Sequence, residues 1–134
     1  MRRLVHAVLV ATLLTACSGT EPATASLPGT YTLVTINGKT LQAILDTDGF
    51  GTRSAVLTIG SDGRYSETIV AKRPPGWDPP ETQLTIGGVW TDMGGTYDFE
   101  VTSGLNSPIP FVGTLSGRTL ELRTAQGAER GYQK

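Results

Sequence analysis

Short apolar stretches with a period of two run through most of this chain, and turn-forming residues separate them. Tyr97, Phe99 and Val101 alternate with polar side chains, and the stretch 119–123 has the same pattern. Successive side chains of a β-strand point to opposite faces, so this alternation predicts strands with one buried face. No stretch of ten or more residues after Leu27 has the spacing of an amphipathic helix. We therefore expect an all-β fold.

Turn signals between the apolar stretches indicate how the strands are connected. Asn37-Gly38 and the stretches 61–63, 92–95 and 116–117 contain Gly, Asn or Asp, which supply the positive φ that tight hairpins need. Eight antiparallel strands with short connections hide their edges by closing into an up-and-down barrel. We predict these strands at 30–36, 39–45, 55–59, 64–71, 83–91, 96–101, 109–115 and 118–124, and a short ninth piece at 130–133 against an edge.

The second of these strands has an alternative. Leu41, Ile44 and Leu45 are spaced as well for one helical turn as for a strand, and a long polar loop follows at 46–54. Both interpretations of 39–45 stay open at this point.

The supply of apolar side chains limits the space inside such a barrel. From Gly29 onward the chain has 31 Val, Leu, Ile, Met, Phe, Tyr and Trp residues, a few of them in loops, and eight short strands offer roughly 24 inward positions. We therefore expect a nearly filled barrel with at most a small void near one mouth. The predicted inward residues are Tyr31, Leu33, Leu57, Ile59, Tyr65, Ile69, Leu84, Ile86, Trp90, Tyr97, Phe99, Val101, Phe111, Leu115, Leu120 and Leu122.

The first residues have the pattern of a secretory signal. Arg2 and Arg3 precede an apolar run, 4–14, that is shorter than the about 20 residues of a membrane-spanning helix. The run ends in Leu-Thr-Ala followed by Cys17. This ending resembles the lipobox of bacterial lipoproteins, in which the cysteine is joined to diacylglycerol, the preceding peptide is removed and the new amino terminus is acylated. The alternative is an ordinary signal followed by a chance cysteine.

The lipobox resemblance implies three segments: a signal peptide at 1–16, a lipidated Cys17 with a flexible tether at 17–27, and a barrel domain at 28–134. Residues 18–26 are small and polar, as a tether requires. In many Gram-negative lipoproteins an aspartate after the cysteine retains the protein at the inner membrane, and Ser18 stands there instead. The resemblance thus implies a lipoprotein of the bacterial cell envelope, anchored in the outer membrane by acyl chains such as palmitate, with the bilayer as the partner of Cys17.

The composition of the chain excludes several chemistries. Without the signal it has 9 basic and 12 acidic side chains, a net charge of −3, whereas nucleic-acid binding needs a basic surplus. His6, the one histidine, lies in the signal, so zinc sites and His-dependent relays are not expected. Residues 46–49, Asp-Thr-Asp-Gly, begin like a calcium loop, but Leu57 stands where that loop has its bidentate glutamate. We expect no nucleic-acid partner, metal or cofactor, and we assign no catalytic residue.

Several turns and strands resemble the small bacterial lipocalin-like lipoproteins. The similarity lies in Gly29-Thr30-Tyr31, Asn37-Gly38, Asp62-Gly63-Arg64-Tyr65 and a late Gly117 followed by Leu120 and Leu122. The resemblance implies a calycin-like barrel that holds a small apolar ligand. In lipocalins an arginine stacks on the tryptophan of the first strand, which suggests that Arg123 or Arg130 caps the barrel floor by stacking on an aromatic residue such as Tyr31. The alternative is that both arginines are surface charges.

The segment 72–81, Lys-Arg-Pro-Pro-Gly-Trp-Asp-Pro-Pro-Glu, differs in composition from the rest of the chain. Its four prolines restrict the backbone, and Trp and Arg are frequent in interface hot spots. Trp77, Arg73 and Asp78 are therefore candidate contacts to a partner or ligand, and Tyr31 and Trp90 are candidate ligand contacts inside the barrel. The alternative is a long hairpin connection in which Trp77 folds over the barrel end as a plug.

These features favour a membrane-anchored, non-catalytic module that binds a small apolar ligand or an envelope protein. One alternative is an isomerase or hydrolase that uses Tyr and carboxylate groups at the barrel mouth. However, Asp98 and Glu100 are expected to face outward, and no catalytic motif is present. The other alternative is a structural or inhibitory lipoprotein that docks through 72–81. The ligand, the partner and the oligomeric state stay open.

Overall fold

A computed structural model describes residues 26–45, 51–105 and 109–134 of the chain. Every strand pairing in this part is antiparallel. Its elements are β1 (Gly29–Ile36), β2 (Lys39–Thr40), α1 (Leu41–Leu45), β3 (Gly51–Ile59), β4 (Arg64–Lys72), β5 (Glu81–Asp92), β6 (Tyr97–Ser103), β7 (Phe111–Ser116), β8 (Thr119–Thr124) and β9 (Glu129–Gln133).

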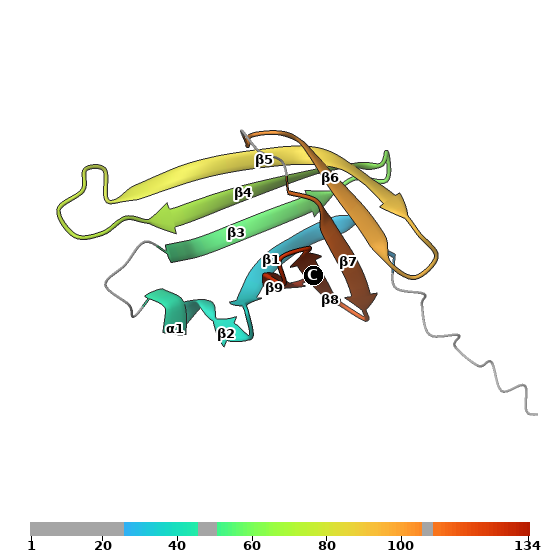
Figure 1. Ribbon diagram of the computed structural model, residues 1–134, viewed down its shortest axis with the longest axis horizontal. Helices are drawn as coiled ribbons and strands as arrows, with labels where there is room; N and C mark the ends of the chain where they lie inside the picture. The colour runs from blue at the N-terminus through green and yellow to red at the C-terminus, as the bar shows by residue number, and fades with distance from the viewer. Residues whose placement is uncertain (1–25, 46–50, 106–108) are drawn as a thin grey trace, which may run out of the picture.

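Eight of these strands close into a barrel (Figure 1). Neighbours in the sheet follow the chain order from β3 to β9, and β1 pairs with both β3 and β9, which closes the sheet. The additional strand, β2, extends from β1 at one end of the barrel. The predicted all-β, eight-stranded up-and-down barrel is therefore confirmed. This architecture is compatible with a lipocalin-like fold.

One predicted barrel strand is wrong. Residues 39–45 are not a strand of the barrel, because β2 covers only Lys39–Thr40 and α1 begins directly after it. The hydroxyl of Thr40 accepts a hydrogen bond from the backbone N–H of Ala43 at 3.4 Å, the contact typical of a residue that caps a helix N-terminus. The helical alternative for this segment is the correct one.

The ninth piece, which was expected to lie against an edge, is the strand that closes the barrel. β9 pairs with β8 on one side and with β1 on the other. Tyr132 lies opposite both Leu33 of β1 and Leu120 of β8, and it is 0% exposed. This one large inward side chain specifies the register of a short strand, because a slip by one residue would turn it to solvent.

The Asn37-Gly38 turn connects β1 to β2 and also holds the start of β9. Asn37 and Gly38 have φ values of 50° and 74°, as the turn of a two-residue hairpin requires. The backbone N–H of Asn37 donates to the carbonyl oxygen of Glu129 at 2.8 Å, and the Oδ1 of Asn37 accepts from the N–H of Glu129 at 2.8 Å. The turn expected from the sequence therefore also takes part in barrel closure.

The inner face of the barrel carries a continuous hydrophobic core. Most of the predicted inward side chains are buried in it, and Trp90, Tyr97 and Leu115 are partly buried against it. Leu84 faces the same side as its cross-strand partner Ile69, but it is 39% exposed because a pocket opens in front of it. Apart from glycines, five buried residues of the described part were absent from the predicted set: Leu27, Ala55, Glu67, Ala71 and Tyr132.

Candidate ligand-binding site

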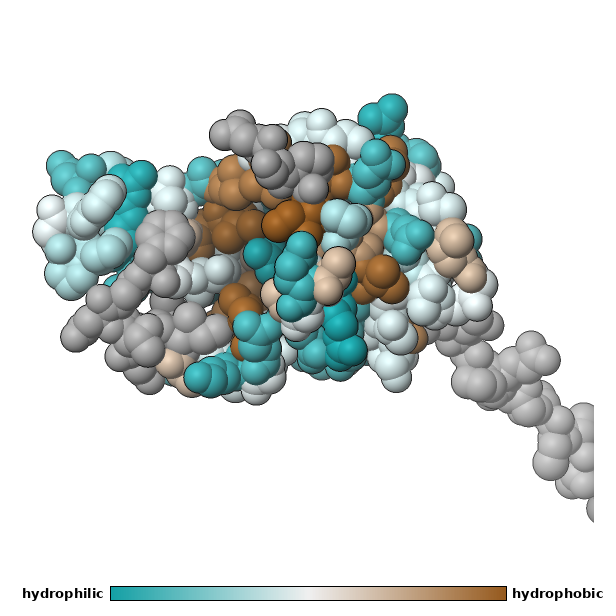
Figure 2. All heavy atoms as spheres, viewed as in Figure 1, coloured by the Kyte–Doolittle hydropathy of each residue, from teal (hydrophilic) through white to brown (hydrophobic). Residues whose placement is uncertain are grey.

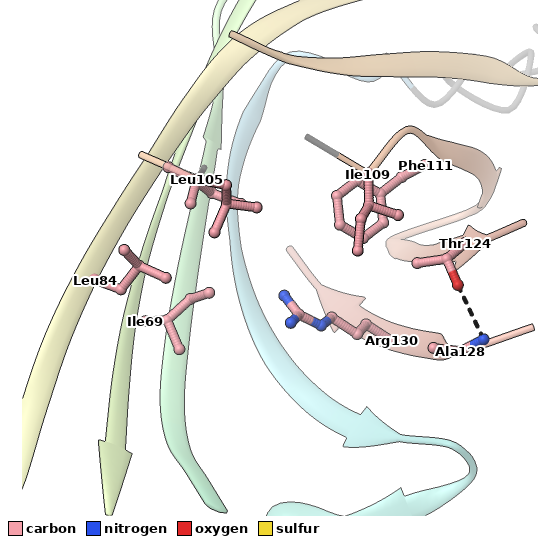
Figure 3. Close-up of a pocket in the computed structure, with 9 residues that line it drawn as sticks. Ile69, Leu84, Leu105, Ile109, Phe111, Thr124, Ala128 and Arg130 are labelled. Atoms are coloured by element: carbon pink, nitrogen blue, oxygen red, sulfur yellow. Dashed lines mark hydrogen bonds between the residues drawn. The ribbon is translucent and has the colours of Figure 1, made fainter. Parts of the chain in front are cut away.

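An apolar pocket of about 230 Å³ opens at one mouth of the barrel, and we call it the mouth pocket (Figure 3). Leu84 and Leu105 lie on one side of the space, and Ile109 and Phe111 lie on the other. Hydrophobic side chains also gather in a hollow near the middle of the face drawn in Figure 2. The residues that line the pocket are Ile69, Leu84, Ile86, Leu105, Ile109, Phe111, Thr124, Ala128 and Arg130.

The pocket lies where the barrel wall is least complete. β6 pairs with β7 only through Tyr97, Asp98 and Phe99, so the later residues of β6 have no β7 partner in the described part of the chain. Leu105 and Ile109 flank this unpaired stretch and are 37% and 39% exposed. A short β6–β7 ladder therefore leaves apolar side chains uncovered at the mouth, and exposed apolar area of this kind is typical of binding sites.

A cluster of polar side chains, formed by Glu67, Arg130 and Tyr132, lies inside the barrel beside this pocket. Nη1 of Arg130 donates to both carboxylate oxygens of Glu67, at 3.1 and 3.2 Å. The hydroxyl of Tyr132 donates to Oε1 of the same carboxylate. Glu67 is 2% exposed, so its charge is stabilised by these donors and not by water. We call these three residues the polar cluster.

The environment of the polar cluster keeps its donors protonated. Burial, and then the nearby Glu67 carboxylate, raise the pKa of Tyr132 above its ordinary value. Burial lowers the pKa of Arg130, but Glu67 and Tyr132 raise it by more, so the guanidinium stays charged. Burial, followed by Glu67 and Glu100, raises the pKa of Tyr65 to about 12. Tyr132 and Arg130 therefore act as hydrogen-bond donors at neutral pH.

Among the described residues, Arg130 is the one charged residue that both belongs to the polar cluster and lines the mouth pocket. Its Nη1 contacts Glu67, and its guanidinium carbon lies 6.0 Å from the ring centroid of Phe111. In Figure 3 the guanidinium points into the space between the two walls of the pocket. Nη1 makes the hydrogen bonds to Glu67, and the guanidinium also interacts with the Tyr132 hydroxyl. A guanidinium has five N–H groups, so Arg130 retains N–H groups for a molecule in the pocket.

Three of the sequence-predicted site residues lie together in the loop 73–80 between β4 and β5, which we call the hairpin tip. The tip extends beyond the rest of the barrel at one end (Figure 1). The guanidinium carbon of Arg73 lies 5.9 Å from the ring centroid of Trp77, and Asp78 is exposed. Trp77 is 62% exposed. The alternative that Trp77 plugs the barrel is therefore wrong.

The other two candidates, Tyr31 and Trp90, lie outside the mouth pocket. Tyr31 is 0% exposed, and its hydroxyl donates to the carbonyl oxygen of Leu27 at 2.6 Å. The indole N–H of Trp90 donates to the carbonyl oxygen of Gly60 at 3.0 Å. The structure therefore places the five candidates in separate regions and brings only those of the hairpin tip together.

The cation that covers Tyr31 is a lysine. Nζ of Lys134 lies 5.5 Å from the Tyr31 ring centroid and donates to the carbonyl oxygen of Pro28 at 2.7 Å. Arg123 forms an outward ion pair with Glu129 at 2.6 Å, while Arg130 faces the interior and contacts Phe111. Neither Arg123 nor Arg130 covers Tyr31, because the register of β9 turns Arg130 toward Glu67, but Arg130 does lie over another aromatic ring, that of Phe111.

The sequence prediction missed the polar cluster, although the pattern contained a signal for it. Glu67 lies two residues from both Tyr65 and Ile69, so it is on the same face of β4 as these two residues, which were predicted to face inward. Arg130 lies two residues from Tyr132 and is on the same face of β9. A carboxylate and a guanidinium at inward positions predict a buried pair, since a lone buried charge is too costly.

The described residues hold no group of three or more His, Cys, Asp or Glu side chains placed to bind a metal ion. Among them, no helix has the length and hydrophobicity to cross a membrane. Asp98 and Glu100 are exposed, as expected. Cys17 and the acidic loop 46–49 lie outside the described residues.

Comparisons with models of known protein families, with curated proteins and with solved structures find no match to this chain. The feature that the structure has in common with lipocalins is the closed eight-stranded antiparallel barrel.

Proposed function

We propose that this protein is a lipid-anchored, non-catalytic barrel that binds a small apolar molecule in the mouth pocket. The observation that carries the proposal is a pocket of about 230 Å³ whose lining residues, in the part of the chain that the structure describes, are aliphatic or aromatic apart from Thr124 and Arg130. An engineered apolar cavity of about 150 Å³ binds benzene, and pockets for drug-sized molecules begin near about 300 Å³. The expected ligand is therefore slightly larger than benzene and smaller than a lipid.

The leader sequence supports the anchoring part of the proposal. A basic start, a short apolar run and the single Cys17 match a lipobox, and an anchor of several acyl chains holds a protein on a bilayer far more firmly than one chain does. β1 begins at the barrel end opposite the mouth pocket. A tether from Cys17 would join the barrel at that end. We place the protein in the bacterial cell envelope, at the outer membrane.

The polar cluster supports binding over catalysis. Each oxygen of the Glu67 carboxylate accepts a hydrogen bond from Arg130, and Oε1 also accepts one from Tyr132. A general base needs a free lone pair within reach of the substrate proton. Three of the about four acceptor sites of the carboxylate are taken, and Glu67 is 2% exposed and does not line the pocket, so the arrangement favours a fixed ion pair over a proton-transfer site.

The ligand proposal is tested by methyl NMR of the barrel domain titrated with a monocyclic aromatic probe such as acetophenone. We expect saturable shifts of the Ile69, Ile86 and Ile109 methyl groups and no shift of Val34, which lies on the outer face. The variant Ile86→Trp fills the pocket and should abolish the shifts. Shifts spread over the whole barrel, or absent from the pocket, would contradict the proposal.

The anchor is tested on the full chain expressed in a Gram-negative host. Wild type should incorporate radiolabelled palmitate and sediment with outer membranes, and Cys17→Ser should lose both properties. Ser18→Asp is the matched control for sorting: it should stay acylated but move to the inner membrane. A wild-type protein that keeps residues 1–16 and carries no acyl chain would overturn the proposal of a lipid anchor.

A second candidate function, docking of an envelope protein through the hairpin tip, is favoured by the 62% exposure of Trp77 beside Arg73. Exposed Trp next to Arg is the composition of interface hot spots. Crosslinking in intact envelopes should give partner adducts that Trp77→Ala removes. Met93→Ala is the control, because Met93 is 59% exposed in the turn between β5 and β6. Equal adducts in both variants would exclude this candidate.

A further inference from the structure

We propose that the mouth pocket selects uncharged molecules that carry a hydrogen-bond acceptor and discriminates against carboxylates. This inference rests on the proposed function and names the chemical class of its ligand. It follows from two observations: Arg130 is the one charged residue among the described residues of the lining, and its charge is already balanced by Glu67.

The first step concerns the hydrogen bonds that Arg130 can still make. A guanidinium has five N–H groups, and here only those of Nη1 bind Glu67. The Arg130 side chain is 28% exposed and lines the mouth pocket, so water has access to the donors that Glu67 and Tyr132 do not use. A ligand without an acceptor would displace this water and leave the donors unpaired, which weakens binding.

The second step concerns charge. Glu67 and Arg130 together carry no net charge, and Tyr132 stays neutral because its pKa is raised. A carboxylate ligand on Arg130 would add a second negative charge close to Glu67, which is 2% exposed. Like charges in a poorly solvated site repel strongly. A carbonyl, ether or ester oxygen accepts the same N–H without adding charge.

The third step concerns shape. The guanidinium lies at one wall, and the opposite wall is formed by Leu84, Leu105 and Ile69 (Figure 3). A ligand that fits has an oxygen at one end, to accept from the guanidinium, and an aromatic or branched aliphatic body, to contact the apolar wall. We therefore expect small aryl ketones, esters or similar neutral molecules.

The test compares three probes with equal numbers of non-hydrogen atoms: acetophenone, benzoate and cumene. Methyl NMR gives the Kd of each for the wild type at neutral pH, where benzoate is ionised. We expect benzoate to bind at least about tenfold more weakly than acetophenone. Benzoate binding as tightly as acetophenone would overturn the inference while leaving the proposed function intact. Failure of all three probes would overturn the proposed function itself.

Two variants separate the charge from the acceptor. Glu67→Gln leaves Arg130 with an unbalanced charge and should strengthen benzoate binding about tenfold, with acetophenone changed less than about threefold. The double variant Glu67→Gln, Arg130→Met removes the guanidinium N–H donors, and it should weaken the binding of acetophenone about tenfold relative to that of cumene. Glu121→Gln, on the exposed face of β8, is the control. If the double variant leaves the ratio of the acetophenone Kd to the cumene Kd unchanged, the argument from the hydrogen-bond acceptor is wrong. If a variant does not fold, the comparison of benzoate with acetophenone on the wild type still decides the argument from charge.

Discussion

Glu67 on β4 and Arg130 on β9 form an ion pair inside the barrel, although β3 and β1 lie between their strands in the sheet. The two residues are 63 positions apart in the chain, and Nη1 of Arg130 lies 3.1 Å from the nearer carboxylate oxygen. The pair therefore links the middle of the chain to its last strand across the interior. Tyr132 on the same strand adds a third hydrogen bond to the carboxylate.

Arg130→Met should destabilise the protein by about 3 kcal/mol, because it leaves the buried Glu67 carboxylate without its cation. Chemical denaturation of the barrel domain measures the change. The double variant with Glu67→Leu should recover most of the loss, since an apolar pair needs no compensation. A single variant as stable as wild type would mean that Glu67 is not charged in the folded state.

Tyr132→Phe should destabilise the protein, whereas Tyr65→Phe should not. The buried hydroxyl of Tyr65 has no hydrogen-bond partner within the described residues, so its removal should be neutral or stabilising by about 1 kcal/mol. The hydroxyl of Tyr132 donates to a buried carboxylate, so its removal should cost about 2 kcal/mol. Denaturant midpoints of the two variants check this, and a loss of similar size in both would contradict the assignment.

The folded protein should lose stability at alkaline pH. The pKa of Tyr65 rises from 10.0 to about 12 on folding, so above about pH 10 the unfolded chain releases a proton that the folded chain retains. The contribution of Tyr65 to the free energy of unfolding should be constant below about pH 10 and fall as the pH rises toward about 12. Urea titrations on either side of this range measure the slope, and Tyr65→Phe should reduce it. A slope that Tyr65→Phe leaves unchanged would contradict the attribution.

Two adjacent glycines of β5 should respond differently to alanine. At Gly88 a Cβ would overlap the carbonyl oxygen of Glu100 and lie 2.8 Å from the Tyr65 ring, so Gly88→Ala should cost about 3 kcal/mol. At Gly87 the nearest atom is the flexible hydroxyl of Ser103 at 3.1 Å, so Gly87→Ala should cost about 1 kcal/mol or less. Thermal unfolding compares the pair, and equal losses would show that close packing at Gly88 is not the cause.

The period of two was sufficient to predict the barrel and most of its core. Residues such as Leu33, Leu57 and Phe99 alternate with polar neighbours, and each is buried as expected. The turn at Asn37-Gly38 was also predictable, because its φ values require these residue types. Local sequence therefore contained the strand positions and the faces that they bury.

The closure of the barrel and the site depended on long-range pairing that local sequence does not contain. β9 has five residues and few apolar side chains, and it is stable as a strand because β1 and β8 both pair with it. The mouth pocket exists because the β6–β7 ladder is short. Alternation places Glu67 and Arg130 on the inner face, but neither the length of the β6–β7 ladder nor the closure that brings β9 beside β1 follows from it.

A crystal structure of the barrel domain under xenon pressure tests the central claim most directly, since xenon occupies preformed apolar cavities. We expect a xenon atom in contact with Ile69, Ile86 and Phe111, inside a closed barrel in which β9 pairs with β1. A pocket filled by its own side chains, with no xenon there, would contradict the claim that this barrel holds a ligand site.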